Sequence, residues 1–234
     1  MTTVLDSNVH NIALEGTFDD TQNIVKALFA DAPFAARTQL TAVNSINFAR
    51  LVAQVVYYFA AAAALGAPHR KVAFTVPTGN FGDVFSGYVA ARMGLPIDKL
   101  LVATNVNDIL DRTLKTGRYE QRGVKPSTSP SMDIQISSNF ERLLFLSYGR
   151  DPNAVRHLMA SLAQSGSFSI GSRELDQIRH EFSSGATDEA ETALTIRETL
   201  AGTGELLDPH TAVGYAVARK SEVSASPMVT LATA

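Results

Sequence analysis

The sequence of 234 residues contains no cysteine, which excludes disulfide bonds and thiolate chemistry and fits a cytoplasmic protein. It also lacks an apolar run of about 18 residues, the length that crosses a membrane as a helix. The longest apolar run, Phe59–Leu65, is rich in alanine and is typical of a buried helix. Met1–Asp6 lacks the basic and apolar regions of a secretory signal. A formal charge of -3 without a cluster of Lys and Arg argues against nucleic-acid and membrane partners.

The signature motifs of several enzyme classes are absent too. Neither G-x-x-x-x-G-K-S/T nor G-x-G-x-x-G occurs, so the common nucleotide-binding fingerprints do not apply. The absence of G-x-S-x-G argues against the catalytic triad of a hydrolase. The five histidines do not follow the spacing of metal ligands, and we therefore predict no metal site.

What the chain does have is a glycine loop between a strand and a helix. Lys71–Val76 is a short apolar run rich in β-branched residues, as expected for a buried strand, and Val84–Met93 has apolar residues at helical spacing. The loop between them contains Gly79 and Gly82. Backbone N–H groups at the start of a helix favour a bound phosphate, and glycine lets the backbone approach an anion closely. An ordinary strand-to-helix turn remains the alternative.

The order of the other elements predicts the fold class. A second apolar strand, Leu100–Thr104, follows the first by about thirty residues, the spacing of a βαβ unit with parallel strands. Val9–Glu15, Leu40–Val43 and Pro227–Ala234 are further candidate strands. We therefore expect an α/β fold with a mostly parallel sheet flanked by helices. Cap signals predict a helical insertion at about 138–220 within one domain, 1–234.

Three small polar residues, Asn44, Ser45 and Asn47, stand where the chain enters a long helix. They could donate hydrogen bonds to a ligand, whereas N-capping of the helix would need only one of them. Apolar residues then recur at helical spacing and predict a face turned to the core: Phe48, Leu51, Val52, Val55, Val56 and Phe59.

A phosphate-cradling loop without a nucleoside-triphosphate signature leaves a phosphorylated cofactor such as pyridoxal phosphate as one ligand that fits. Several blocks in this order resemble threonine synthase: Gly16–Asp20, Asn44–Asn47 with Gln54–Phe59, Val76–Asp83, Ala103–Asp108 and Ser131–Ile134. The resemblance covers nearly the whole chain. It implies the large domain of a fold type II pyridoxal-phosphate enzyme, a lyase that converts O-phosphohomoserine and water to threonine and phosphate in the last step of threonine biosynthesis.

The resemblance also implies roles for individual residues. The backbone N–H groups of one loop would hold the cofactor phosphate: Gly79, Asn80, Phe81, Gly82 and Asp83. Thr233 would lie next to the pyridine nitrogen, and Asn44, Ser45 and Asn47 would face the substrate, a small phosphorylated amino acid.

One departure from the family concerns its Schiff-base lysine, which lies N-terminal to all of these blocks. The six lysines of this chain lie outside that context: Lys26, Lys71, Lys99, Lys115, Lys125 and Lys220. We therefore expect an internal fragment that lacks the N-terminal part with the lysine and the C-terminal tail, and that is inactive because proton transfer at the substrate needs an amine. The alternatives are a non-catalytic phosphate- or anion-binding domain and a related pyridoxal-phosphate-dependent phospho-lyase.

Overall fold

The computed structural model describes residues 4–16, 18–221 and 226–232, and the chain divides into two compact units, Met1–Thr41 and Ala42–Ala234. The first unit contains helices α1 (Phe18–Ala30) and α2 (Ala32–Thr38). Oδ1 of Asp31 caps α2 by accepting a hydrogen bond from the Phe34 N–H at 3.0 Å. The strand predicted at Val9–Glu15 is wrong. Residues 10–16 are exposed, and no described residue pairs with them, so their backbone lacks the ladder that makes a strand.

The second unit is built on a parallel sheet of four strands in the order β5-β2-β1-β6. The strands are β1 (Val72–Pro77), β2 (Ile97–Thr104), β5 (Phe182–Ala186) and β6 (Met228–Thr230). Each residue of β1 is buried, as expected for a strand covered on both faces. A separate antiparallel pair joins β3 (Arg118–Glu120) to β4 (Ser167–Ser169). The predicted α/β fold with a parallel sheet flanked by helices is confirmed.

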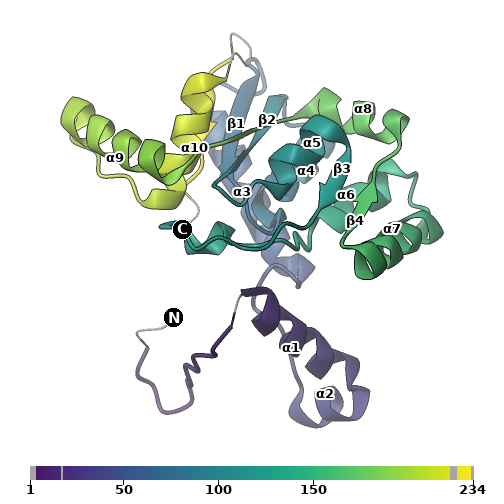
Figure 1. The fold of residues 1–234 in the computed structure, drawn as a ribbon. Coiled ribbons are helices and arrows are strands. Elements are labelled where there is room, and N and C mark those ends of the chain that lie inside the picture. Colours follow the sequence, from purple (N-terminus) through teal and green to yellow (C-terminus); the bar gives the residue numbers. More distant parts are fainter. Residues whose placement is uncertain (1–3, 17, 222–225, 233–234) are drawn as a thin grey trace. The chain divides into compact units, whose positions relative to one another are not determined.

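Helices surround this sheet, and Figure 1 shows α9 beside α10 on one side of it. Their bounds are α3 (Phe48–Ala64), α4 (Gly82–Arg92), α5 (Ile109–Thr116), α6 (Phe140–Ser147), α7 (Pro152–Ser165), α8 (Ser172–Glu181), α9 (Glu189–Thr203) and α10 (Pro209–Lys220), with a 3-10 turn η1 at Pro130–Met132. None of the helices within the described residues combines the length and the apolar character that crossing a bilayer requires.

The two faces of the sheet belong to two apolar clusters. Phe74 and Val76 of β1 point into the larger cluster, which includes side chains from α3, α4, α6 and α8. Leu101 and Ala103 of β2 point the other way and pack with Val213 of α10. Successive side chains of a strand alternate between faces, so short apolar strands can serve both layers. The carboxyl end of β1 is thereby held from both sides.

Helix α3 buries a different face from the predicted one. Leu51 and Val55 are buried as expected, together with Tyr58 and Ala62, whereas Phe48, Val52 and Val56 are 47%, 51% and 62% exposed. The reason is the close approach of α4: a Cβ on Gly87 would lie 2.5 Å from the Tyr58 ring. The lack of a side chain at Gly87 lets the two helices touch at this point.

Two strand predictions change in the structure, and the main sheet contains one strand that was not predicted. Leu40–Val43 forms no strand, and the strand expected at Pro227–Ala234 is limited to Met228–Thr230 among the described residues. Phe182–Ala186, inside the predicted helical insertion, forms β5, so the stretch 138–220 adds a strand to the main sheet. β5 has the sequence Phe-Ser-Ser-Gly-Ala, which lacks a strand signature and gains its conformation from pairing with β2.

Candidate functional site

The loop from Thr78 to Phe81 joins β1 to α4 at the carboxyl edge of the sheet. Phe81 occupies the N-cap position in the left-handed conformation, with φ 68° and ψ 4°, and contributes no side-chain cap hydrogen bond. Its ring is buried, with centroids 5.2 Å from Phe140 and 5.6 Å from Phe182. This packing stabilises a conformation that is uncommon for a residue with a side chain. The first turn of α4 thus starts without a capping side chain from its N-cap residue.

The segment that leads into α6 holds the loop from one side. The Ser137 hydroxyl donates to the Gly79 carbonyl at 2.8 Å, and the Asn139 N–H donates to the Asn80 carbonyl at 3.0 Å. The Asn80 side chain accepts a hydrogen bond from the Gly82 N–H at 3.0 Å. With these carbonyl groups satisfied by protein donors, the loop is fixed before any ligand arrives, which reduces the ordering cost of binding.

Of the three polar residues at the start of α3, Ser45 reaches the loop. Its buried hydroxyl oxygen accepts hydrogen bonds from Nδ2 of Asn80 at 2.9 Å and Nδ2 of Asn139 at 3.1 Å. Asn47 instead caps α3 through the Ala49 N–H, and Oδ1 of Asn44 accepts from the Ile46 N–H. The substrate role of the three stays a prediction, and in this structure Ser45 supports the loop.

Asp83 lies in the first turn of α4 with its side chain turned towards α3. The Tyr58 hydroxyl donates to the Asp83 carbonyl oxygen at 2.8 Å and lies 3.3 Å from Oδ1, while Oδ2 is buried without a hydrogen-bond partner. Burial raises the pKa of Asp83 from 3.8 to about 6, against the opposing effects of the Tyr58 hydrogen bond and the Arg50 charge. Burial, followed by the Asp83 charge, also raises the pKa of Tyr58. Any contact of Asp83 with a phosphate would therefore come from its backbone.

A second polar cluster follows β2 and centres on Asp133. Oδ1 of Asp133 accepts hydrogen bonds from Asn105 at 2.9 Å, Asn107 at 2.8 Å and the Ser127 hydroxyl at 2.6 Å, and Oδ2 accepts from the Ser127 N–H at 2.8 Å. Hydrogen bonds to a carboxylate are stronger than those between neutral groups. The cluster fixes the chain immediately after η1, beside the glycine loop.

The start of η1 touches that loop directly. A Cβ on Gly79 would lie 2.5 Å from the Ser131 carbonyl oxygen and 3.3 Å from Cα of Met132, so only glycine fits this close approach of two backbones. The Ser131 N–H donates to Nε2 of His210 at 3.2 Å. Nδ1 of the same ring lies 3.3 Å from Oδ1 of Asp208, the residue that caps α10.

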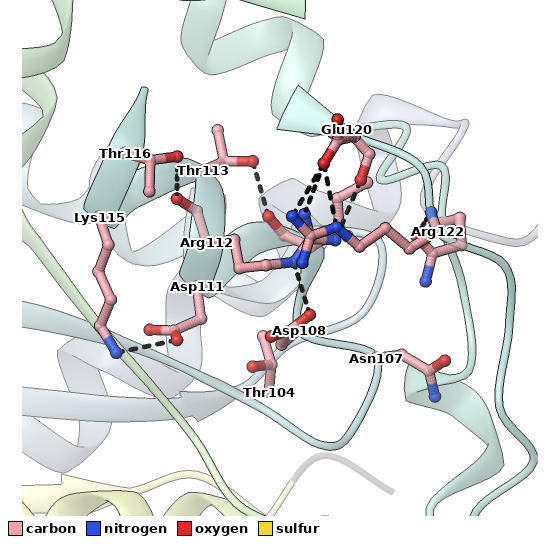
Figure 2. A network of polar contacts seen from close by, with 12 residues as sticks. Thr104, Asn107, Asp108, Asp111, Arg112, Thr113, Lys115, Thr116, Glu120 and Arg122 are labelled. Atoms are coloured by element: carbon pink, nitrogen blue, oxygen red, sulfur yellow. Dashed lines mark hydrogen bonds and ion pairs between the residues drawn. The ribbon is translucent and has the colours of Figure 1, made fainter. Parts of the chain in front are cut away.

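Figure 2 shows the contacts that hold α5, which follows the Asn105–Asn107 stretch. Nε of Arg112 donates to Asp108 at 2.8 Å, and Nη2 donates to the Glu120 carbonyl at 3.0 Å. Hydrogen bonding from Arg122 and the charge of Arg118 lower the pKa of the half-buried Glu120 carboxyl. The network links α5 to β3.

The predicted site residues thus have different outcomes. Gly79, Asn80, Phe81 and Gly82 form one loop at the edge of the sheet with Ser45 beside it, whereas Thr233 lies outside the described residues. The prediction missed several residues that brace the loop: Asn105, Ser131, Asp133, Ser137, Asn139 and His210. Asn105 could have been found from the sequence, because Asn105–Asp108 is a polar stretch directly after a strand. The contact between Ser131 and His210 has no local signal in the sequence, since the two residues lie 79 positions apart.

Four lysines are engaged elsewhere in the fold. Lys71 lies 3.9 Å from Asp98, and Lys115 lies 2.9 Å from Asp111. Lys99 donates to the carbonyl groups of Arg179 and His180, and Lys220 pairs with Glu191. Within the described residues, no cluster of three or more His, Asp or Glu could hold a metal ion.

The donors of the loop suit a phosphate. The first N–H groups of a helix need partners, and here the N-cap side chain supplies none, although the Asn80 side chain caps the Gly82 N–H. The helix dipole adds partial positive charge at the same place. Gly82, the first residue of α4, is packed closely, since a Cβ there would lie 3.0 Å from Cβ of Ser45. The arrangement can bind an anion through main-chain N–H groups without a lysine or a metal ion.

No family model matches the sequence. The chain is 56% identical over 235 residues to the threonine synthase of Pseudomonas aeruginosa, which covers 100% of this chain and 50% of that protein. The crystal structure of pyridoxal-phosphate-bound threonine synthase from Brucella melitensis superposes with a TM-score of 0.90 and 61% identity, covering 97% of this chain and 49% of the other. Yeast threonine synthase superposes with a TM-score of 0.83 and 40% identity over 100% of this chain and 50% of the other.

The chain therefore spans about half the length of the curated relatives it matches. The resemblance read from the sequence blocks is confirmed along the whole chain, and the fold is that of these pyridoxal-phosphate enzymes.

Proposed function

Because this chain is homologous to threonine synthases along its whole length, we propose that it forms the cofactor-phosphate site of a pyridoxal-phosphate-dependent lyase. The observation that carries the proposal is the start of α4. There the N-cap residue Phe81 supplies no capping side chain, while Ser45, Ser137 and Asn139 fix the loop in front of it. A phosphate bound there would accept main-chain hydrogen bonds along the helix dipole.

Each loop residue has a task in this proposal. Gly79 lets the loop pass beneath η1, and Gly82 begins the helix where Ser45 leaves no room for a side chain. Asn80 ties the loop to Ser45 and to the Gly82 N–H. Phe81 anchors the turn in the apolar cluster. These contacts orient the phosphate and thereby the ring attached to it.

When bound, pyridoxal phosphate supplies an electron sink for bond cleavage at the amino-acid substrate. For the full-length protein we propose the reaction of threonine synthase, in which O-phosphohomoserine and water give threonine and phosphate. The substrate would then be a small phosphorylated amino acid, and a cytoplasmic location would suit an enzyme of amino-acid biosynthesis. Thr233 next to the pyridine nitrogen, and Asn44, Ser45 and Asn47 towards the substrate, complete the proposed site.

The 234 residues alone are not expected to turn over substrate. None of the six lysines matches the Schiff-base lysine context of the family, and the four described above pair with groups away from the loop. We therefore expect cofactor binding without a covalent bond to a specific lysine. Borohydride treatment followed by peptide mapping checks this point, and a cofactor fixed to one lysine would contradict it.

Calorimetric titration with pyridoxal phosphate and with pyridoxal tests the proposal. Pyridoxal lacks the phosphate, so the difference between the two affinities isolates the contribution of the loop. We expect pyridoxal phosphate to bind at least about tenfold more tightly than pyridoxal, because pyridoxal cannot form the charge-assisted hydrogen bonds of the phosphate. Equal affinities, or no saturable binding of pyridoxal phosphate, would contradict it.

Two other functions follow from the same loop. A non-catalytic anion-binding domain would bind inorganic phosphate as tightly as pyridoxal phosphate, because the ring would add nothing. A related phospho-lyase would bind the cofactor equally well but, at full length, would release phosphate together with a keto acid. Inorganic phosphate in the titration and product analysis of the full-length enzyme separate these alternatives.

A further inference from the structure

We propose that His210 is a positioning residue for the phosphate loop and acts through η1. The inference rests on the proposed function for its purpose, but the contacts that carry it are independent of any ligand. His210 lies at the start of α10, 79 positions along the chain from Ser131, whose N–H it accepts at 3.2 Å.

The first step is the contact between η1 and Gly79. The Ser131 carbonyl oxygen lies 2.5 Å from the position that a Cβ on Gly79 would take, which is too close for two such atoms. The distance between η1 and the loop therefore limits where Gly79 and the N–H groups of the following residues can lie. A shift of η1 towards the loop would push the loop, and a shift away would remove its support.

The second step concerns what fixes η1. Its far end is held by Asp133 through hydrogen bonds from Asn105, Asn107 and Ser127. Met132 is 3% exposed and packs with Val213 and Val217 of α10. The polar contact between the start of η1 and α10 is the hydrogen bond from Ser131 to His210.

The third step is the state of the His210 ring. Nε2 can accept from the Ser131 N–H only if the proton of the neutral ring is on Nδ1. Nδ1 lies 3.3 Å from Oδ1 of Asp208. Burial acts to raise the pKa of Asp208, but hydrogen bonds from Thr211 and His210 outweigh it and lower that pKa, so the carboxylate is charged and can accept a hydrogen bond from the Nδ1–H group.

The anchor of this arrangement is firm. Asp208 also accepts from the N–H groups of His210 at 2.9 Å and Thr211 at 3.2 Å and so caps α10. A Cβ on Gly214, one turn further on, would lie 3.0 Å from Pro77, the last residue of β1. Helix α10 therefore touches both the strand that leads into the loop and, through His210, the turn that covers it.

Two-dimensional nitrogen NMR on the wild-type protein gives the first test. We expect the tautomer of His210 with the proton on Nδ1. A proton on Nε2 would overturn the proposal, since that nitrogen could not then accept from Ser131. The measurement needs no variant and cannot fail through misfolding.

Two amide substitutions give the second test. His210→Gln can place an acceptor oxygen near the position of Nε2, whereas His210→Asn is too short to reach Ser131. Without ligand, we expect hydrogen exchange at Ser131 to become about tenfold faster in H210N, the size expected for one lost hydrogen bond, with faster exchange also at Gly79. H210Q should stay close to wild type. His157→Asn, on the exposed side of α7, is the matched control.

The same variants connect the inference to the cofactor. H210N should bind pyridoxal phosphate about tenfold more weakly, and H210Q should restore most of that loss. Unchanged exchange at Gly79 in H210N would overturn the inference, as would equal losses in H210N and H210Q. Should wild type fail to bind pyridoxal phosphate while the exchange differences appear, the proposed function would fail and the positioning role would stand.

Discussion

Replacing Asp83 by asparagine should change how the stability of the protein depends on pH. Burial raises the pKa of the Asp83 carboxyl from 3.8 to about 6 in the folded state. The unfolded chain loses this proton near pH 3.9, and the folded protein holds it until about pH 6. Between these values the unfolded state is favoured progressively as the pH rises. The contribution of Asp83 protonation to the free energy of unfolding is complete below about pH 4 and is lost as the pH passes 6.

The shift sets the magnitude. A rise from 3.8 to about 6 corresponds to about 3 kcal/mol at neutral pH, because each unit is about 1.4 kcal/mol. The asparagine side chain in D83N would keep the acceptor oxygen for the Tyr58 hydroxyl but would carry no charge. Any cost of burying the amide NH2 in place of Oδ2 is the same at each pH. The wild type should therefore lose up to about 3 kcal/mol relative to D83N between pH 4 and pH 8.

Urea denaturation of both proteins at several pH values measures this difference, with Asp176→Asn on the exposed side of α8 as control. The free energy of unfolding of D83N minus that of wild type should rise with pH and level off above about pH 7. A difference that stays constant from pH 4 to pH 8, or one that falls, would refute the burial argument. The control should show little change of either kind.

Three further substitutions test the packing of the site. Gly79→Ala places a methyl group on the Ser131 carbonyl oxygen, which must shift, so we expect a loss of about 1–3 kcal/mol in urea denaturation and weaker binding of pyridoxal phosphate in calorimetry. Tyr58→Phe removes the hydrogen bond to the Asp83 carbonyl and should cost about 1–2 kcal/mol of stability in the same denaturation assay. Asp133→Asn replaces a carboxylate that accepts several hydrogen bonds, and a thermal unfolding scan should show a loss of about 2–3 kcal/mol.

Each of these has a control on the same chain. Gly202→Ala in α9 meets no neighbouring atom within 4 Å and should leave binding unchanged without lowering stability, because alanine favours a helix more than glycine does. Tyr57→Phe is the control for Tyr58→Phe, because Tyr57 is the neighbouring residue in the chain but is 48% exposed. Asp176→Asn is the control for Asp133→Asn. Losses in a control as large as those in its partner would show that the contact itself does not matter.

Local signals were sufficient for the centre of the fold. The β-branched run of β1, the glycines after it and the apolar spacing of α4 are all contained in about twenty residues, so strand, loop and helix could be predicted together. The capped helices of the second half were predicted for the same reason, since Asp151–Pro152 and Asp208–Pro209 are local start signals.

What the sequence did not reveal depends on contacts between distant residues. β5 exists because it pairs with β2, and its own residues favour no strand. Ser45 meets Asn80 across 35 positions, and His210 meets Ser131 across 79. The apolar pattern of α3 fits more than one buried face, and packing against Gly87 of α4 selects the one centred on Tyr58. Periodicity predicts that a helix has an apolar side, whereas its partner decides which side is buried.

The most direct test of the phosphate site is an NMR titration of the nitrogen-labelled protein with pyridoxal phosphate. The backbone amides of residues 79–81, 83 and 84 should show the largest shifts and should saturate together, because their N–H groups would be the phosphate ligands, whereas the Gly82 N–H already donates to Asn80. Pyridoxal at the same concentrations should leave them nearly unchanged. Saturable shifts that centre elsewhere in the protein, with residues 79–84 unaffected, would contradict the assignment of this loop as the cofactor-phosphate site.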